Sequence, residues 1–284
     1  MSVIKTSVSR NTWKIWVYLF LFILAILILF PLVNTVSQSF MTNQEVNVFP
    51  PRIFPFEPTI QSYIQVVTQG DVRLDLWLRN SLVAASGYTL LVLLICSPAA
   101  YAFSRLNFPG KKILFAILMV TIMIPGQVTL IPNFLLLRDL RWLDTFYALV
   151  LPGAANVFGL FLLRQFFMQI PRDIEEAVVL DGGGYFARFR HAILPSSGNV
   201  LAALSIFVFL GHYNDLFWPL IVTNTLETRT LPVGLSIIQS SYAGQFRPMI
   251  LAGAVLSFIP ILVVFIFFQR QIIKGVVTTG MGGR

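Results

Sequence analysis

The chain has 284 residues, of which 56% are hydrophobic and only 11% are charged, and its formal net charge is +8. A soluble domain has about 25% charged residues, so this composition excludes an ordinary water-soluble core and indicates that a bilayer is the solvent. The positive charge does not indicate nucleic-acid binding, because no basic stripe with interleaved aromatic residues accompanies it. The single cysteine, Cys96, and the two histidines, His191 and His212, have no metal-ligand spacing, so we expect no metal site.

Along the chain, several apolar stretches have the roughly 20 residues that a helix needs to cross the hydrocarbon core. There are six of them, at residues 15–36, 81–103, 113–132, 145–168, 199–222 and 249–268. The first is too long for a signal peptide and has no cleavage site after it, so we interpret it as a retained anchor. We therefore predict an all-α membrane protein with six transmembrane helices.

The basic residues predict how these helices are oriented. If the N-terminus is cytoplasmic, 13 of the 20 Lys and Arg residues fall in inner segments and 7 in outer ones. Such an excess is typical of the cytoplasmic side, so we expect both termini there. We divide the chain into an anchor helix with its outer segment, residues 1–76, and a core, residues 77–284. Prolines inside the spans are typical of a transporter with a bent, partly polar interior, although any one of them could be a simple packing kink.

Residues 170–195 are unusually rich in charge. They hold seven of the 32 charged residues of the chain (20 Lys and Arg plus 12 Asp and Glu). Asp181-Gly182 is a strong turn signal, and the helical periodicity on either side predicts two short amphipathic helices. The pattern alone fits a hairpin that docks into a partner protein or a loop that lies on lipid headgroups.

Catalytic functions find no support in these residues. Carboxylates such as Glu176 and Asp181 could take part in acid–base chemistry, but no nucleophile stands beside a base. The run Gly182 to Gly184 lacks the spacing of a phosphate-binding loop, so we expect no ATP site in this chain.

The stretch "EEAVVLDGGGYFARFRHAILP" resembles the Glu-Ala-Ala loop of ABC-importer permease subunits, whose pattern is E-A-A-x-x-D-G, about ten residues, and then I-x-L-P or a close variant. The matching residues are Glu176, Ala177, Asp181, Gly182, Leu194 and Pro195. Val178 replaces the second alanine, and Gly183 stands where alanine is common. Three successive glycines suggest a loosened turn.

Other segments resemble the sugar-importer branch, and in detail the second permease subunit of maltose-type importers. They are "RNSL" at 79–82, "AYAFSRLNFPGKK" at 100–112, "FLLRQFF" at 161–167, "YNDLFWPLIV" at 213–222, "TLPVGL" at 230–235 and "QRQIIKG" at 269–275. The resemblance implies the type I ABC importer permease fold in a bacterial or archaeal cell membrane. It also implies a subunit of an importer for a carbohydrate or polyol derivative.

The resemblance further implies partners: a homologous second permease subunit, a dimer of cytoplasmic ATPases that carry ATP and Mg, and an extracellular or periplasmic solute-binding protein. The chain itself would have no cofactor and no enzymatic activity. The loop at 170–195 would be the element that couples to the ATPase. The coupling residues are then Glu175, Glu176, Ala177, Asp181, Gly182, Gly183, Phe186 and Phe189.

Two further groups of residues are candidates for contact with the solute or its carrier. Tyr213, Asn214, Asp215 and Trp218 combine polar groups with aromatic faces and suit a sugar path, although Asn214 and Asp215 could equally bond helix backbone. In maltose-type importers the loop equivalent to 223–247 reaches the binding protein, with Gln239, Ser240 and Tyr242 as the expected tip here. An ordinary exposed connector is the alternative for this segment.

Three other functions were weighed for the whole chain. One is an ABC permease for a solute that is not a sugar. Another is a secondary transporter driven by an ion gradient, but the spans carry almost no mid-membrane acid of the kind such transporters use. An intramembrane enzyme would need a catalytic constellation in the spans, and the sequence offers none.

Overall fold

The structure is a computed structural model that describes residues 7–68, 72–242 and 246–280, with side chains described over 13–68, 72–242 and 246–267. Within these residues the regular elements are helices and there is no strand. The chain divides into two compact units, Met1–Val72 with Leu235–Phe258, and Arg73–Gly234 with Ile259–Arg284. The boundary proposed after residue 76 stays a prediction.

The first unit contains α1 (Ser7–Ser39), α2 (Asn43–Val46) and α3 (Gln61–Thr68), together with parts of α14 (Leu231–Tyr242) and α15 (Arg247–Gly280). In the span Trp13–Ser39 of α1, the 18-residue window that marks it as apolar has a mean hydropathy of 2.9 and is not buried within the chain, whereas Ser37, Gln38 and Ser39 at its end are buried. Glu45 organises the proline-rich loop after α2, because its carboxylate accepts hydrogen bonds from the backbone N of Phe56 (2.9 Å) and of Glu57 (3.1 Å).

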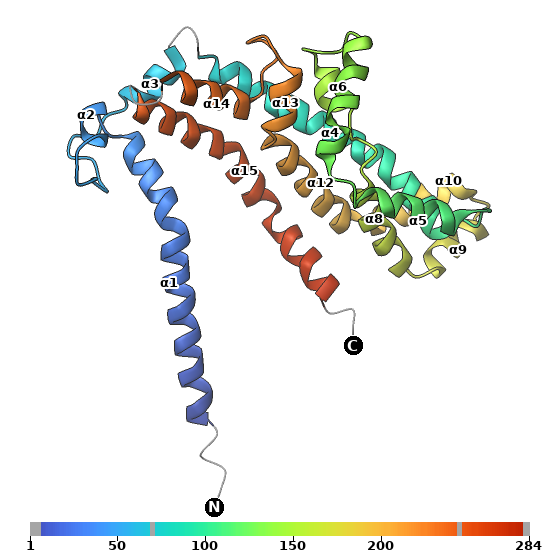
Figure 1. The fold of residues 1–284 in the computed structure, drawn as a ribbon. Helices are drawn as coiled ribbons and strands as arrows, with labels where there is room; N and C mark the ends of the chain where they lie inside the picture. Colours follow the sequence, from blue (N-terminus) through green and yellow to red (C-terminus); the bar gives the residue numbers. More distant parts are fainter. Residues whose placement is uncertain (1–6, 69–71, 243–245, 281–284) are drawn as a thin grey trace, which may run out of the picture. The chain divides into compact units, whose positions relative to one another are not determined.

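The second unit is built around α4 (Leu74–Arg105), against which α8 (Val157–Gln169) and α12 (Gly198–Tyr213) pack (Figure 1). Their contact forms an apolar core that includes Val92, Cys96, Leu163, Phe167 and Leu204. The other elements of this unit are α5 (Lys111–Thr121), η1 (Gly126–Thr129), α6 (Leu130–Asp139), α7 (Phe146–Val150), α9 (Asp173–Leu180), α10 (Tyr185–Arg188), η2 (Phe189–Ile193), α11 (Leu194–Ser196) and α13 (Phe217–Val222).

Three described helices are long and apolar enough to cross a membrane, or up to five spans if each bent pair counts as one. The pairs are Lys111–Thr121 with Gly126–Asp139, bent by 91°, and Tyr185–Ser196 with Gly198–Tyr213, bent by 77°. The six-span count and the cytoplasmic termini stay predictions.

Three of the spans expected from the sequence are interrupted, the first being 113–132, which breaks between α5 and η1. The segment 145–168 consists of α7 and α8, because Pro152 and Gly153, which has a φ of +76°, lie in the break between them. The segment 199–222 is likewise broken after Tyr213, and α13 follows as a separate helix from Phe217.

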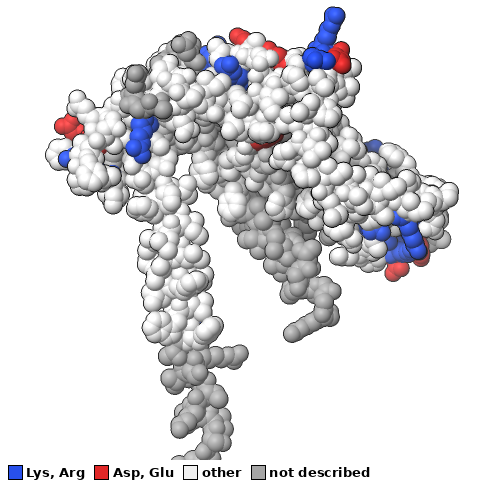
Figure 2. All heavy atoms as spheres, in the orientation of Figure 1, with Lys and Arg blue, Asp and Glu red and all other residues white. Residues whose placement is uncertain are grey.

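In the second unit, Lys, Arg, Asp and Glu gather at two ends, near α5 and α9 at one and near α6 at the other (Figure 2). The surface between them is largely uncharged in this view. This distribution fits a membrane protein whose apolar middle faces lipid or other apolar helices.

Candidate functional site

The charged stretch folds as the predicted hairpin, which we define as residues 170–195. Its first helix, α9, carries Asp173, Glu175 and Glu176 in its first turn, where the helix dipole favours acids. Its second helix, α10, continues through one π-helical turn, η2, into α11. Pro195 lies inside α11 instead of ending the helix, and the break comes at Ser197.

A helix C-cap motif closes the turn of the hairpin. The backbone N of Gly182 donates to the Val179 carbonyl at 2.9 Å, and the backbone N of Gly183 donates to the Val178 carbonyl at 2.8 Å. Gly182 has a φ of +80°, in the left-handed region that this motif requires. Gly182 of the Asp-Gly pair thus sets the turn, because residues other than glycine disfavour this backbone conformation.

Gly183 is tightly packed against Val178, whereas the looseness expected of the three-glycine turn stays a prediction. A Cβ added to Gly183 would lie 2.6 Å from Val178 Cγ1 and 2.7 Å from the Val178 carbonyl oxygen. The two departures from the family pattern, Val178 and Gly183, therefore touch each other. Val178, which is larger than the alanine of the family pattern, occupies the space left by Gly183, which is smaller.

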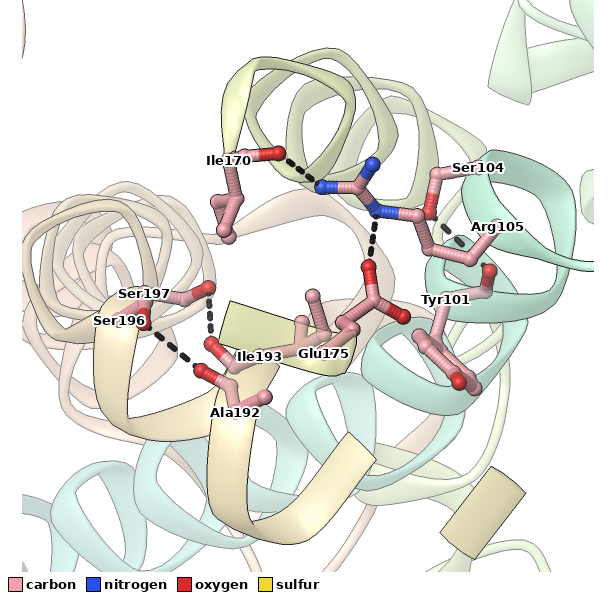
Figure 3. Close-up of polar contacts among 9 residues, drawn as sticks. All are labelled: Tyr101, Ser104, Arg105, Ile170, Glu175, Ala192, Ile193, Ser196 and Ser197. Carbon is pink, nitrogen blue, oxygen red and sulfur yellow. Dashed lines mark hydrogen bonds and ion pairs between the residues drawn. The ribbon is translucent and has the colours of Figure 1, made fainter. Parts of the chain in front are cut away.

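A buried ion pair ties the hairpin to α4. The Nε of Arg105, in the last turn of α4, lies 2.9 Å from Oε1 of Glu175, and each side chain is 8% exposed (Figure 3). Arg105 also donates through Nη2 to the Ile170 carbonyl (Figure 3). Glu175 therefore has its partner inside this chain, which corrects its grouping with residues that face another protein.

The other side of the hairpin is exposed. Ile174 is 41% exposed, Leu180 88% and Phe186 72%, although they are apolar. Of the remaining predicted coupling residues, Glu176, Ala177, Asp181 and Gly182 are exposed, and Gly183 and Phe189 are half-buried. Phe189 turns toward α4, and its ring lies 5.4 Å from that of Tyr101. On α9, Ile174 and Ala177 are exposed and Val178 is half-buried, while Glu175 is buried.

The four residues proposed for the sugar path do not lie together in one cavity. Asp215 lines a cavity of about 340 Å³ beside α12, and the other three residues are not part of its lining. Asn214 donates to the Leu210 carbonyl at 2.9 Å, and Trp218 donates through Nε1 to the Ala148 carbonyl at 2.9 Å. Tyr213 is buried, with its ring against Phe209.

The predicted binding-protein contact lies on α14. Gln239 and Ser240 are exposed near the end of this helix. Tyr242 is half-buried, and its ring lies 5.8 Å from that of Phe246. Residues 231–242 of the segment 223–247, which the sequence suggested to be a loop, thus form a helix.

Asp144 and Asn80 hold the start of this segment, residues 223–230, and the sequence analysis missed both. Oδ1 of Asp144 accepts hydrogen bonds from the backbone N of Asn224 (2.8 Å) and Thr225 (3.1 Å) and from the Thr228 hydroxyl. Burial raises the pKa of Asp144, but these hydrogen bonds outweigh burial, so the pKa lies below its usual value.

Asn80, near the start of α4, donates to the carbonyls of Glu227 (2.7 Å) and Arg229 (3.0 Å). Trp77 adds a bond from Nε1 to the Leu226 carbonyl at 3.2 Å. The "RNSL" motif was the sequence signal that could have identified Asn80, because it places the buried Asn80 amide near the end of a long apolar helix.

Comparison with known proteins gives consistent results. The chain is 31% identical to the arabinooligosaccharides transport system permease protein AraQ of Halalkalibacterium halodurans, over 92% of this chain and 93% of that protein. It is 30% identical to the sn-glycerol-3-phosphate transport system permease protein UgpE of Brucella abortus, over 92% and 95% of the two chains.

A chain in the crystal structure of a bacterial ABC transporter involved in the import of the acidic polysaccharide alginate has the same fold. The TM-score is 0.82 at 22% identity, over 94% of this chain and 99% of that one. Residues 93–277 match the family described as "Binding-protein-dependent transport system inner membrane component". The chain therefore belongs to this family of transport permeases and is a multi-pass membrane protein.

Proposed function

We propose that this chain is a transmembrane permease subunit of an ATP-driven importer that takes up a carbohydrate or polyol derivative delivered by a solute-binding protein outside the cell. Family membership supports transport, and the names of relatives that carry arabinooligosaccharides or sn-glycerol-3-phosphate support the solute class. The partners proposed with it are a second permease subunit and a dimer of ATPases that bind ATP and Mg.

The observation that carries this proposal is the exposed face of the hairpin. Ile174, Leu180 and Phe186 expose large apolar surfaces next to the carboxylates of Glu176 and Asp181. Water solvates an apolar face of this kind poorly, and such patches mark sites of contact with another protein. The exposed charges of the hairpin are mixed, with Asp173, Glu176 and Asp181 beside Arg172 and Arg190, so the hairpin lacks the basic cluster that binds anionic headgroups. The partner proposed for this face is an ATPase subunit with an apolar cleft rimmed by basic groups.

Within the second unit, α4 provides a mechanical link from this face to the far end of the bundle. It has 32 residues and therefore a length of about 48 Å, at 1.5 Å per residue. Its C-terminal Arg105 holds the hairpin through Glu175, and near its N-terminus Asn80 holds residues 227–229. A displacement of the hairpin by the ATPase would thus move both ends of α4 together.

The test uses the importer purified with its partner subunits and reconstituted in proteoliposomes. Glu176→Ala and Asp181→Ala should leave the chain in the membrane but reduce the amount of ATPase that copurifies and the uptake driven by ATP. Asp139→Ala, which removes an exposed acid at the end of α6, is the control and should change neither. Normal ATPase binding and uptake in both hairpin variants would contradict the coupling role.

The same vesicles decide between the importer and a secondary transporter. Uptake that needs ATP and the solute-binding protein supports the importer, whereas uptake driven by an ion gradient without ATP would replace the proposal. Contact with the binding protein is tested separately, with a cross-linker on Ser240→Cys, since Ser240 is exposed on α14. Absence of any adduct during turnover, at Ser240 or at Gln239→Cys, would leave α14 as an ordinary connector.

A further inference from the structure

A polar cavity lies beside α12 in the second unit, away from the hairpin. Its volume is about 340 Å³, within the range of pockets that hold small ligands. It is lined by Tyr88, Asn156, Phe158, Phe207, Val208, Gly211, His212 and Asp215, from α4, α8, α12 and the segments next to them. Most of the surface of these helices is apolar, so several polar side chains in one hollow need an explanation.

One wall of the cavity is aromatic. The rings of Tyr88 and His212 are stacked, with centroids 4.3 Å apart and an angle of 10° between their planes. Tyr88 is fixed by the bond from its hydroxyl to the Gly153 carbonyl, at 2.9 Å. The ring nitrogens of His212 hydrogen-bond no described residue, so they are available to a ligand. Phe158 and Phe207, which are 53% and 55% exposed, add apolar ring surface.

The polar groups are held in place while part of their bonding capacity stays free. Oδ1 of Asp215 accepts hydrogen bonds from the backbone N of Phe217 (3.0 Å) and Trp218 (3.4 Å). Oδ2 of the same carboxylate has no hydrogen-bond partner among the described residues. The side-chain oxygen of Asn156 caps α8 by accepting from the Gly159 backbone N at 2.7 Å. A carboxylate oxygen and an imidazole, both unoccupied, are groups that hydroxyls bind well.

The charge of the lining limits what the cavity accepts. Asp215 is its only acidic residue, and no Lys or Arg is among the residues that line it. A phosphate or uronate group placed here would face the Asp215 carboxylate without a Lys or Arg to compensate its charge. A ring with hydroxyl groups and no charge would meet hydrogen-bonding partners and aromatic faces instead.

We propose that this cavity is a subsite for a neutral, hydroxyl-bearing sugar ring, which packs against the aromatic wall and donates a hydroxyl hydrogen bond to Asp215. This inference rests on the proposed function and narrows its solute class. It favours a neutral sugar over two charged solutes. One is sn-glycerol-3-phosphate, named for some relatives, and the other is the acidic polysaccharide named for the structural neighbour.

Gly211 allows the cavity to be filled without disturbing the fold. It lines the cavity, and a Cβ added there meets no atom within 4 Å. Leucine is also a better helix former than glycine, so Gly211→Leu should be tolerated in α12. Gly198→Leu is the matched control, because Gly198 lies in the same helix, has equally open space around it and is not part of the lining. Asp215→Asn removes the charge but keeps an oxygen that can accept from Phe217.

The experiment measures ATP-driven uptake by the complete importer, purified with its partner subunits and solute-binding protein and reconstituted in vesicles. The probes are arabinotriose, glycerol 3-phosphate and an alginate disaccharide. We expect uptake of arabinotriose, its loss in Gly211→Leu, and wild-type uptake in Gly198→Leu. Asp215→Asn should raise the apparent KM about tenfold, as expected for one hydrogen bond to a charged group. The amount of each variant in the membrane should equal that of the wild type.

The possible failures are distinguishable. If Gly211→Leu and Asp215→Asn both transport arabinotriose like the wild type, the subsite is refuted and the importer function stands. If the wild type prefers glycerol 3-phosphate or the alginate disaccharide, the assignment to a neutral sugar is refuted, and again the importer stands. If uptake by the wild type is driven by an ion gradient without ATP, the proposed function fails, and the subsite with it.

Discussion

The guanidinium of Arg105 lies 2.9 Å from the carboxylate of Glu175, and both side chains are 8% exposed, although they come from helices 70 residues apart in sequence. Truncating one member of a buried ion pair leaves an uncompensated charge, which costs about 3–5 kcal/mol. We therefore expect Arg105→Ala or Glu175→Ala to lower the melting temperature of the purified complex and to release the ATPase. Calorimetry and copurification measure both effects.

The exposed ion pair of Arg138 with Asp139 is the control for this prediction. Its atoms are also 2.9 Å apart, but the side chains are 57% and 66% exposed, so Arg138→Ala should cost at most about 1 kcal/mol. Replacing Arg105 and Glu175 together by methionine should restore much of the stability, because no unpaired charge remains. Equal effects of Arg105→Ala and Arg138→Ala would show that the buried pair does not hold the hairpin.

The run of three glycines allows backbone strain to be tested by itself. Gly182 has a φ of +80° and Gly184 a φ of −78°, and a Cβ at either position meets no atom within 4 Å. Because a β-branched residue is strongly disfavoured at positive φ, Gly182→Val should displace α10 and weaken ATPase copurification and uptake. Gly184→Val should behave like the wild type. If both variants couple normally, the shape of the turn does not matter for coupling.

The contact between Val178 and Gly183 predicts a partial rescue. Gly183→Ala should destabilise the hairpin, because the new Cβ would lie 2.6 Å from Val178 Cγ1. Adding Val178→Ala removes that clash and should recover part of the loss of ATPase binding. The recovery should be incomplete, since the Val178 carbonyl oxygen, 2.7 Å from the same Cβ, stays in place. A double variant no better than Gly183→Ala would contradict this packing.

Acid should release residues 223–230. The pKa of Asp144 is lower in the folded chain than its usual value, so its hydrogen bonds stabilise the fold above the unfolded pKa of about 3.9. This stabilisation is lost as the pH falls through the lower, folded pKa. Limited proteolysis of the segment, by pepsin in acid and by thermolysin near neutral pH, each normalised to cleavage of an unfolded control peptide at the same pH, should therefore increase steeply toward pH 2.

Two variants at Asp144 separate the carboxylate from the backbone. Asp144 has a φ of 60°, which asparagine tolerates better than alanine. Asp144→Asn keeps an acceptor oxygen and should reduce the pH dependence while cleavage at neutral pH stays low. Asp144→Ala should raise cleavage at every pH. Identical cleavage profiles in the wild type and Asp144→Asn would mean that this carboxylate does not hold the segment.

Membrane topology follows from the excess of basic residues in the inner segments. Reporters fused after Lys112, after Pro195 and at the C-terminus should lie in the cytoplasm, whereas one inserted between Arg138 and Asp144 should lie outside. A pair of reporters with opposite requirements, alkaline phosphatase and green fluorescent protein, makes each position its own control. A cytoplasmic signal from the insertion at 138–144 would refute the six-span arrangement.

The sequence alone determined the membrane setting, the helical class, the hairpin and its Asp-Gly turn. These features depend on composition, on local periodicity or on one residue with a special backbone conformation, and all three can be read without knowing the fold. The family likeness followed from the same local motifs. The turn was predicted correctly at Gly182 because its left-handed conformation is a property of the residue itself.

Only the tertiary structure decided what depends on distant partners. Glu175 and Glu176 are adjacent glutamates, but only Glu175 is buried. It is buried because Arg105, 70 residues earlier in the sequence, lies on its side of α9. The cavity likewise joins Tyr88, Asn156 and His212, which no sequence spacing connects. The break after Val150 has a distant partner as well, since the Tyr88 hydroxyl of α4 donates to the Gly153 carbonyl there, and a membrane tolerates a break only where other groups satisfy the backbone.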